Sequence, residues 1–173
     1  MVAEAKKRGL PVSCEVTQHH FTLCDQEMLP YDSAFKMKPP IRCNHDVAAC
    51  IEGIASGVVD ALATDLAPHA GSEKMQEFER CPFGIIGLET AVGLTFDRLV
   101  NPGIISLNRM IELYTTGPAK ILKLNRGTLQ PGSPADVTIL DPSHEWTYDL
   151  NKSASKSRNS PFHGWQFTGG AVA

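Results

Sequence analysis

The chain has 173 residues, 42% of them hydrophobic, which suits one globular domain with a sizeable core, and its formal net charge of −3 gives a nucleic-acid partner no electrostatic support. No apolar run approaches the roughly 18 residues of a membrane helix, and the N-terminal MVAEAKKRGL lacks the apolar centre of a signal peptide. The five cysteines form no CxxC pair, so we expect free thiols in a cytoplasmic protein without a membrane partner.

The first elements have the pattern of a helix followed by a parallel strand. Residues 2–7 are predicted to be the last turns of a helix, with Gly9 just beyond its end. The segment LPVSCEVT (10–17) is predicted to be a strand. A strand should precede the helix in such a unit, and none does here, so we expect the chain to be part of a larger fold.

A second helix and strand are predicted after an irregular, proline-containing segment that ends near residue 40. Asn44 is the expected N-cap of a helix that runs to about Gly57, since apolar residues recur at helical spacing between them. The segment VVDALATD (58–65) is apolar nearly throughout, which is typical of buried parallel strands.

The remaining sequence predicts a long loop, three helices and a change to β structure. Residues 66–82 form a polar loop of a length that is uncommon unless it is functional. Helices are predicted from about residue 84 to 100, from 107 to 115 after a Ser106 cap, and from 119 to 124 after a Gly-Pro break. ADVTILD (135–141) alternates like a half-exposed strand, and the last stretch has only weak strand patterns.

Two parallel strands do not make a stable sheet alone, so two interpretations of the fold remain. The chain is either part of a (β/α)₈ barrel or a small α/β domain.

The strongest chemical signal is ATDLAPHA (63–70). It places Asp65 at the carboxyl end of a buried strand and His69 in the loop that follows. In a (β/α)₈ barrel the active site lies at this end of the strands, and a carboxylate there can ligate a metal and accept a proton. The alternatives are that Asp65 caps the turn that Pro68 favours and that His69 is an ordinary loop residue.

Three weaker signals accompany it. His19 and His20 follow the first strand, and the alternative to a site is one buried and one exposed histidine. FKMKPPIR (35–42) offers a cationic loop for a carboxylate substrate, or an ordinary solvated loop. CPFGIIGLET (81–90) places Gly84 near a predicted helix start, where free amides bind anions, although such joins are also common without function.

Taken in this order, these segments resemble the dihydroorotases of the bacterial type. The matching segments are PVSCEVTQHH, KMKPPIR, VVDALATDLAPHAGSEK and CPFGIIGLET, and TTGPAKILKL and SRNSPFHGWQFTGGAVA extend the match over essentially the whole chain. GTLQPGSPADVTILD is similar to cyclic amidohydrolases generally. The resemblance implies an α/β fold in which residues 1–124 are the C-terminal portion of a (β/α)₈ barrel and residues 125–173 are part of a small β-rich domain.

The resemblance also implies a site built on two zinc ions, most of whose ligands lie on strands outside this sequence. Strands 10–17 and 58–65 would be the seventh and eighth of the barrel. Asp65 then matches the last metal ligand and the catalytic acid/base, and His69 matches a contact to the substrate carboxylate. Phe83 and Gly84 match a loop whose backbone holds the pyrimidine ring.

Two positions depart from the family pattern. Lys38 stands where members commonly have an asparagine that contacts the substrate, and Leu66 stands where they commonly have a histidine. Lys38 could still bind a carboxylate as a point charge. Leu66 is expected to affect packing more than chemistry.

The activity implied is the zinc-dependent, reversible hydrolysis of dihydroorotate to carbamoyl-aspartate in pyrimidine (UMP) biosynthesis. With one ligand of its own, the chain alone is expected to be inactive. A non-catalytic dihydroorotase-like scaffold for aspartate transcarbamoylase, or another cyclic amidohydrolase such as a hydantoinase or allantoinase, is the alternative. Besides the small-molecule substrate, a second copy of the chain or aspartate transcarbamoylase is the implied partner.

Overall fold

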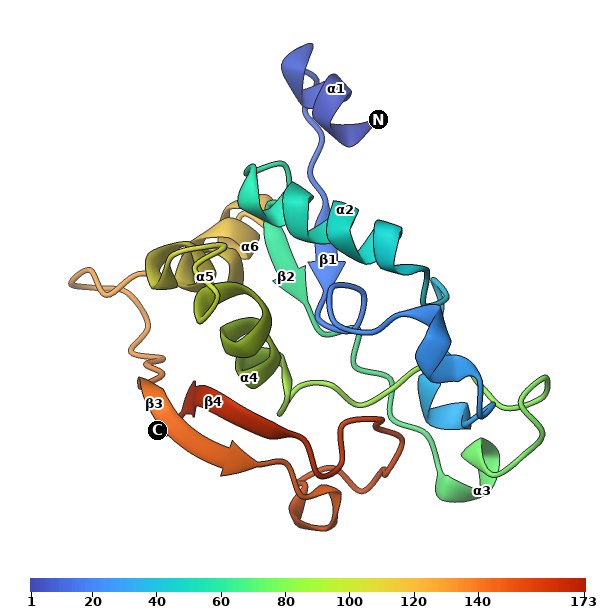
Figure 1. Cartoon of the computed structure of the whole chain (residues 1–173). Helices are drawn as coiled ribbons and strands as arrows, with labels where there is room; N and C mark the ends of the chain where they lie inside the picture. The colour runs from blue at the N-terminus through green and yellow to red at the C-terminus, as the bar shows by residue number, and fades with distance from the viewer.

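The structure is a computed structural model that describes residues 1–173 (Figure 1). Its helices are α1 (Val2–Lys7), α2 (Asn44–Ala55), α3 (Gly71–Lys74), α4 (Ala91–Thr95), α5 (Leu107–Tyr114) and α6 (Thr116–Ile121), and its strands are β1 (Glu15–Thr17), β2 (Ala61–Ala63), β3 (Leu140–Thr147) and β4 (Gln166–Ala171). Short 3₁₀ turns occupy residues 25–28, 33–35 and 150–152, and a π-helical turn over residues 96–100 continues α4.

Strands β1 and β2 pair in parallel, with Val16 opposite Leu62, and α2 connects them. This is the βαβ arrangement that the sequence predicts for residues 10–65. Both strands are shorter than predicted, because pairing is confined to three residues on each side. Residues 10–13 instead form an extended, exposed connection from α1, in which Pro11 has no N–H to donate to a neighbouring strand (Figure 1).

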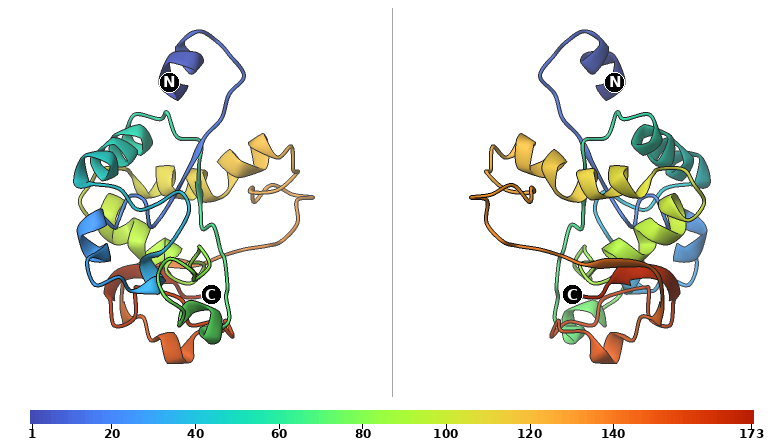
Figure 2. Two further views of the ribbon diagram at one scale, coloured as in Figure 1. Left: turned by 90° about the vertical axis from the view of Figure 1, so that its right-hand side faces the viewer. Right: turned by 90° about the vertical axis from the view of Figure 1, so that its left-hand side faces the viewer.

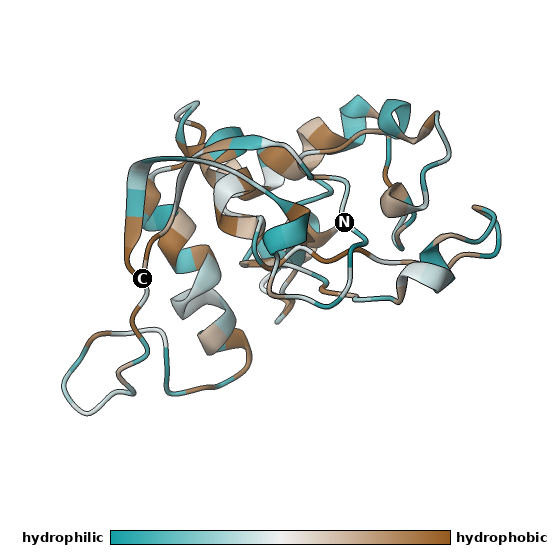
Figure 3. Ribbon diagram, turned by 90° about the horizontal axis from the view of Figure 1, so that it is seen from below, coloured by the Kyte–Doolittle hydropathy of each residue, from teal (hydrophilic) through white to brown (hydrophobic).

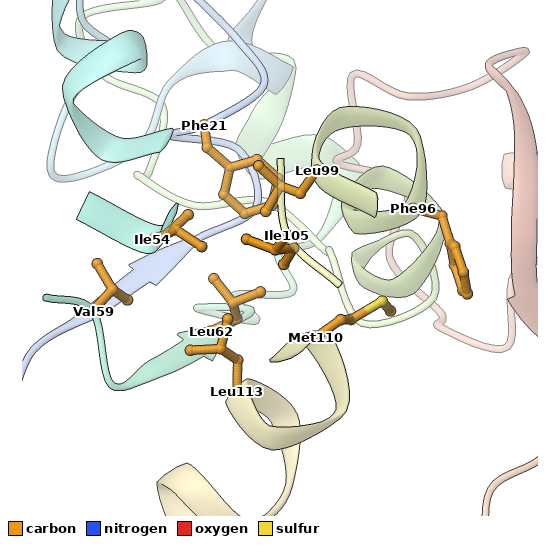
Figure 4. Packing of buried hydrophobic residues seen from close by; sticks show 9 residues of the cluster. All are labelled: Phe21, Ile54, Val59, Leu62, Phe96, Leu99, Ile105, Met110 and Leu113. Carbon is orange, nitrogen blue, oxygen red and sulfur yellow. The ribbon is translucent and has the colours of Figure 1, made fainter. Parts of the chain in front are cut away.

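The larger core cluster lies between this βαβ unit and the helices that follow it (Figure 4). Helix α2 and β2 contribute from one side, while the π-helical turn and α5 contribute from the other. Each such buried side chain stabilises the fold by about 1.5–3 kcal/mol. The helices carry apolar and polar positions side by side, as amphipathic helices do (Figure 3). The cluster consists of Phe21, Ile54, Val59, Leu62, Phe96, Leu99, Ile105, Met110 and Leu113.

Strands β3 and β4 form an antiparallel pair that packs on α4 and the π-helical turn. The strand predicted at residues 135–141 is wrong in position, since β3 begins at Leu140 and extends to Thr147. Of the predicted segment, Leu140 and Asp141 lie in β3, and Ile139 extends the pairing by donating to Ala173 O at 2.6 Å and accepting from Val172 N at 2.9 Å. At the packing surface, a Cβ on Gly169 would lie 2.4 Å from the Phe96 ring, so glycine permits the close approach.

Three helix boundaries differ from prediction. The helix predicted from Gly84 begins only at Ala91, because Ile85 forms a parallel bridge with Leu66 and a turn over residues 88–90 precedes the helix. The predicted break at Gly117-Pro118 is wrong, because both lie in the first turn of α6, where proline's missing N–H costs no helical bond. Asn44 is the first helical residue rather than the cap, which is Cys43.

Two segments extend from the body of the molecule. Helix α1 stands apart at the end of the extended connection, and the loop that precedes β3 projects on another side (Figure 2). Lys6 ties α1 to the remainder through an ion pair with Asp60 at 2.6 Å. None of the helices combines the length and the apolar character needed to cross a bilayer.

Candidate functional site

Asp65 lies two residues beyond the end of β2, at the carboxyl end of the parallel pair. Its φ is +46°, a left-handed conformation that aspartate tolerates better than most residues. The residue is exposed, and its carboxylate makes no hydrogen bond or ion pair within the chain. A carboxylate in this position is free to bind a ligand.

A groove of about 710 Å³ runs beside β1 and is lined by Asp65, Lys38 and His20 among others. His20 is already engaged, with Nδ1 2.6 Å from Thr17 Oγ1 and Nε2 2.9 Å from Pro39 O. Lys38 has no hydrogen-bond or ion-pair partner, and its Nζ lies 5.9 Å from the centre of the Phe83 ring. The groove therefore presents an unpaired carboxylate and an unpaired ammonium group.

The turn at Phe83 and Gly84 packs directly against the loop that follows Asp65. Gly84 has φ +121°, and a Cβ there would lie 2.4 Å from the Cβ of Ala67, so this position requires glycine. Ala67 N donates to Ile85 O at 2.9 Å. The 65–69 loop and the 83–85 turn thus form one unit, although Gly84 does not stand at a helix N-terminus as predicted.

His69 belongs to the same unit. Its Nε2 lies 2.9 Å from Phe83 O, and its Nδ1 lies 3.6 Å from the Glu73 carboxylate. Both ring nitrogens are therefore engaged within the chain. An N–H contact from this imidazole to a substrate carboxylate would require one of these two interactions to break.

His19 and His20 have different environments. His19 is 1% exposed, and neither ring nitrogen has a hydrogen-bond partner in the protein. Burial, and secondarily the charge of His20, lowers the pKa of His19 to about 3. One buried and one partly exposed histidine is the alternative that the sequence left open for this pair.

The lysines of the 35–42 segment also differ. Lys36 is buried, and its Nζ donates to Phe78 O at 2.6 Å and to Glu79 O at 2.8 Å, so it is not available to a substrate. Arg42 pairs with Asp46 at 3.2 Å. Of the three cations in this predicted loop, only Lys38 is free.

Sequence reasoning missed two residues that support the turn, Lys74 and Asn159. Lys74 Nζ donates to Pro82 O at 3.0 Å and to Gly84 O at 3.1 Å. Asn159 Nδ2 donates to Ala67 O at 2.9 Å and to Gly84 O at 3.1 Å. A lysine in a polar loop and an asparagine in a Ser-rich segment carry no sign of burial in their local pattern.

The chain supplies at most part of a metal centre. No group of three or more His, Cys, Asp or Glu side chains lies close enough together to hold an ion. Asp65 fits the role of a single ligand, since its oxygens are unpaired and exposed. A catalytic zinc usually takes about three protein ligands, so the residues of this chain do not hold one by themselves.

The chain resembles known amidohydrolases in sequence and structure. It is 62% identical over 174 residues to a dihydroorotase from Solibacter usitatus, and 47% identical over 172 residues to one from Geobacter metallireducens. These matches cover 100% and 99% of the chain but 40% of each relative, so the chain spans about two-fifths of their length. The resemblance to dihydroorotases is confirmed.

Solved structures of related enzymes have the same fold over this region. L-hydantoinase (dihydropyrimidinase) from Arthrobacter aurescens superimposes with a TM-score of 0.92 at 29% identity, covering 99% of this chain and 39% of that one. D-hydantoinase (dihydropyrimidinase) from Thermus sp. gives a TM-score of 0.89 at 26% identity, covering 98% of this chain and 39% of its own. The model of the amidohydrolase family matches residues 2–169, and the chain belongs to that family.

Proposed function

We propose that the protein is a dihydroorotase, hydrolysing the cyclic amide of dihydroorotate to carbamoyl-aspartate, and the reverse, in pyrimidine biosynthesis. The observation that carries the proposal is the 62% identity to a dihydroorotase over the whole chain. The unpaired Asp65 carboxylate at the carboxyl end of β2 is consistent with it.

The fold proposed for the whole protein is a (β/α)₈ barrel in which β1 and β2 are the seventh and eighth strands. Residues 1–124 would complete the barrel, and residues 125–173 would contribute to a small β-rich domain. The parallel β1–α2–β2 unit and the antiparallel β3–β4 pair support this division. In such a barrel Asp65 would face the active-site mouth.

Asp65 is the proposed general base and then general acid. Bound zinc, held mainly by residues outside this chain, would lower the pKa of water toward about 7 and so supply hydroxide at neutral pH. As hydroxide attacks the ring amide carbonyl, the Asp65 carboxylate would accept its proton and return it to the leaving ring nitrogen.

Substrate binding is assigned to Lys38, which lines the groove, and to the Phe83–Gly84 turn and His69, which do not line it. The Phe83–Gly84 turn and His69 would hold the ring and its carboxylate, and Lys38 would add a positive charge on the same side. Lys38 lines the groove together with Asp65, and its Nζ lies 5.9 Å from the centre of the Phe83 ring, which supports this role.

A chimera tests the proposal. This chain would replace the matching 40% of the Solibacter usitatus dihydroorotase, which supplies the remainder. We expect dihydroorotate turnover within about tenfold of the parent, and Asp65→Asn should reduce it by orders of magnitude without loss of the fold. The matched control is Asp136→Asn, at an exposed carboxylate far from the groove in sequence. A folded but inactive chimera, or an active Asp65→Asn variant, would refute the proposal.

A hydantoinase is the second candidate, because L-hydantoinase superimposes with a TM-score of 0.92. The two differ in substrate charge, since dihydroorotate carries a carboxylate and hydantoin does not. The unpaired Lys38 favours the anionic substrate. Assays of the same chimera with both substrates distinguish them, and faster turnover of hydantoin would favour the alternative. The scaffold role, the self-association and the cytoplasmic location stay predictions.

A further inference from the structure

Lys74 is a buried cation without an anionic partner. It is 7% exposed, no carboxylate lies within ion-pair distance, and its Nζ is surrounded by backbone carbonyls. Lysine is almost never buried unless it is paired, because removing an ammonium group from water is costly. We therefore ask which part of the backbone is stabilised by the hydrogen bonds of this ammonium group.

The ammonium group bonds to the turn on both sides of Phe83. It donates to Pro82 O at 3.0 Å and to Gly84 O at 3.1 Å, one carbonyl on each side of Phe83. A longer bond of 3.5 Å reaches Lys36 O. The same Lys36 carbonyl accepts the Gly84 N–H at 2.9 Å. Both the N–H and the C=O of Gly84 are therefore hydrogen-bonded.

Lys36 makes the reciprocal connection. Its Nζ donates to Phe78 O and Glu79 O in the loop between α3 and the turn, and it lies 4.7 Å from the centre of the Phe83 ring. Lys74, the last residue of α3, therefore bonds to the backbone carbonyl of Lys36. The side chain of Lys36 in turn bonds to backbone carbonyls of the loop that follows α3. The segment that carries Lys38 and the turn that carries Phe83 are fastened to each other from both sides.

We propose that Lys74 is a positioning residue, whose ammonium group presets the Pro82–Gly84 turn and registers it against the segment bearing Lys38 before substrate arrives. Without it, the Pro82 carbonyl would lose its charged donor and the Gly84 carbonyl would keep only the bond from Asn159 Nδ2, so the turn would relax. Preset geometry of this kind avoids an ordering cost on binding. The catalytic consequence rests on the proposed function, whereas the effect on the turn does not.

Amide hydrogen exchange on the chimera tests the structural part directly. In Lys74→Met, which keeps an unbranched side chain one atom shorter and removes its donors, the Gly84 and Ala67 amides should exchange at least about tenfold faster, with most other amides unchanged. Lys36→Met should instead accelerate exchange near Phe78 and Glu79. Lys156→Met, at an exposed lysine without partners, is the matched control and should change neither region.

Kinetics of the chimera test the positioning role. Loss of stability alone would reduce the fraction of active enzyme and so the apparent kcat, with KM unchanged. Mispositioning of a substrate-binding turn should raise KM for dihydroorotate by about tenfold or more in Lys74→Met, with Lys156→Met at the parent value. Lys74→Arg, which restores a charged donor, should recover part of the loss.

The two readouts separate this inference from the proposed function. Unchanged exchange at Gly84, or accelerated exchange with an unchanged KM, would overturn the positioning role. A chimera that is inactive before any substitution would refute the proposed function and leave the exchange result to decide on Lys74. Should Lys74→Met not fold, Lys74→Gln, which keeps a neutral donor on a shorter side chain, should show the same pattern at smaller amplitude.

Discussion

His19 links the stability of the fold to pH. Its pKa is lowered from 6.5 to about 3 by burial, so between these values the unfolded chain binds a proton that the folded chain does not. The free energy of unfolding should therefore fall as pH falls through this window, by up to about 1.4 kcal/mol per unit from this group. The contribution is complete above pH 6.5.

Urea unfolding from pH 7 to pH 3 would measure this linkage. His19→Leu should have a shallower pH dependence than the parent, because the variant has no imidazole to titrate in the unfolded state. His45→Gln, at an exposed histidine, should keep most of the parent slope. If the free energy of unfolding depends on pH equally in the parent and in His19→Leu, the pKa of His19 is not lowered in the folded chain.

Gly84 is the position where an added methyl group should do most damage to the candidate site. Gly84→Ala places a Cβ 2.4 Å from that of Ala67 at φ +121°, so we expect a loss of roughly 2–5 kcal/mol from overpacking and backbone strain. Gly57→Ala, at φ +77° with nothing within 4 Å, isolates the backbone effect and should lose about 1–2 kcal/mol. Equal losses in thermal or urea unfolding would contradict the steric argument.

At single residues, sequence pattern predicted the exposed groups better than the buried ones. The position of Asp65 just beyond a strand was predicted because a carboxylate after an apolar run is visible in the sequence. Lys74 and Asn159 were not, because their burial depends on carbonyls from segments up to 92 positions away. The 35–42 segment shows the same limit, since its pattern does not tell the buried Lys36 from the exposed Lys38.

Among the elements, α4 and α5 are joined by a buried hydrogen bond that can be tested. Tyr114 Oη lies 2.8 Å from Thr95 Oγ1 and 3.2 Å from Ala91 O, and burial raises the pKa of Tyr114 to about 12. Tyr114→Phe should lower the free energy of unfolding by about 1 kcal/mol, because it removes this bond without a large cavity. Tyr31→Phe, at an exposed tyrosine, should lose less than about 0.5 kcal/mol in the same urea titration.

Elements with local signals were predicted well, and those set by distant contacts were not. Helix α5 follows Ser106, whose hydroxyl accepts the Arg109 N–H as a cap should. The segment at Gly84 was predicted to be helical, but pairing of Ile85 with Leu66 holds it extended. Strand β3 was displaced for a similar reason, since its register is set by pairing with residues of β4 that lie 19 to 31 positions later in the chain.

For the whole molecule, the parallel sheet is the feature that requires a partner. β1 and β2 pair only with each other, and two parallel strands are not a stable sheet in isolation. Exposed apolar side chains also occur on the segments that leave the body, including Leu10 and Val12 before β1 and Leu129 and Val137 before β3. Strand edges and apolar surface of this kind are what additional barrel strands would cover.

Reconstitution from two pieces is therefore the expected behaviour of this chain. Alone, it should turn over no measurable dihydroorotate and bind fewer than one tight zinc, since no three of its His, Cys, Asp or Glu side chains lie close enough together to hold an ion. Adding the remaining part of the Solibacter usitatus relative should raise its melting temperature by an amount that grows with the logarithm of the concentration of that piece, because a partner that binds only the folded state stabilises it. Turnover and metal content should appear together with the rise in melting temperature.

With Asp65→Asn the melting temperature should still rise while turnover does not return, because the strand edges are intact and only the carboxylate is lost. Two tightly bound zinc ions on the isolated chain, by metal analysis, would contradict this division of the site between the two pieces.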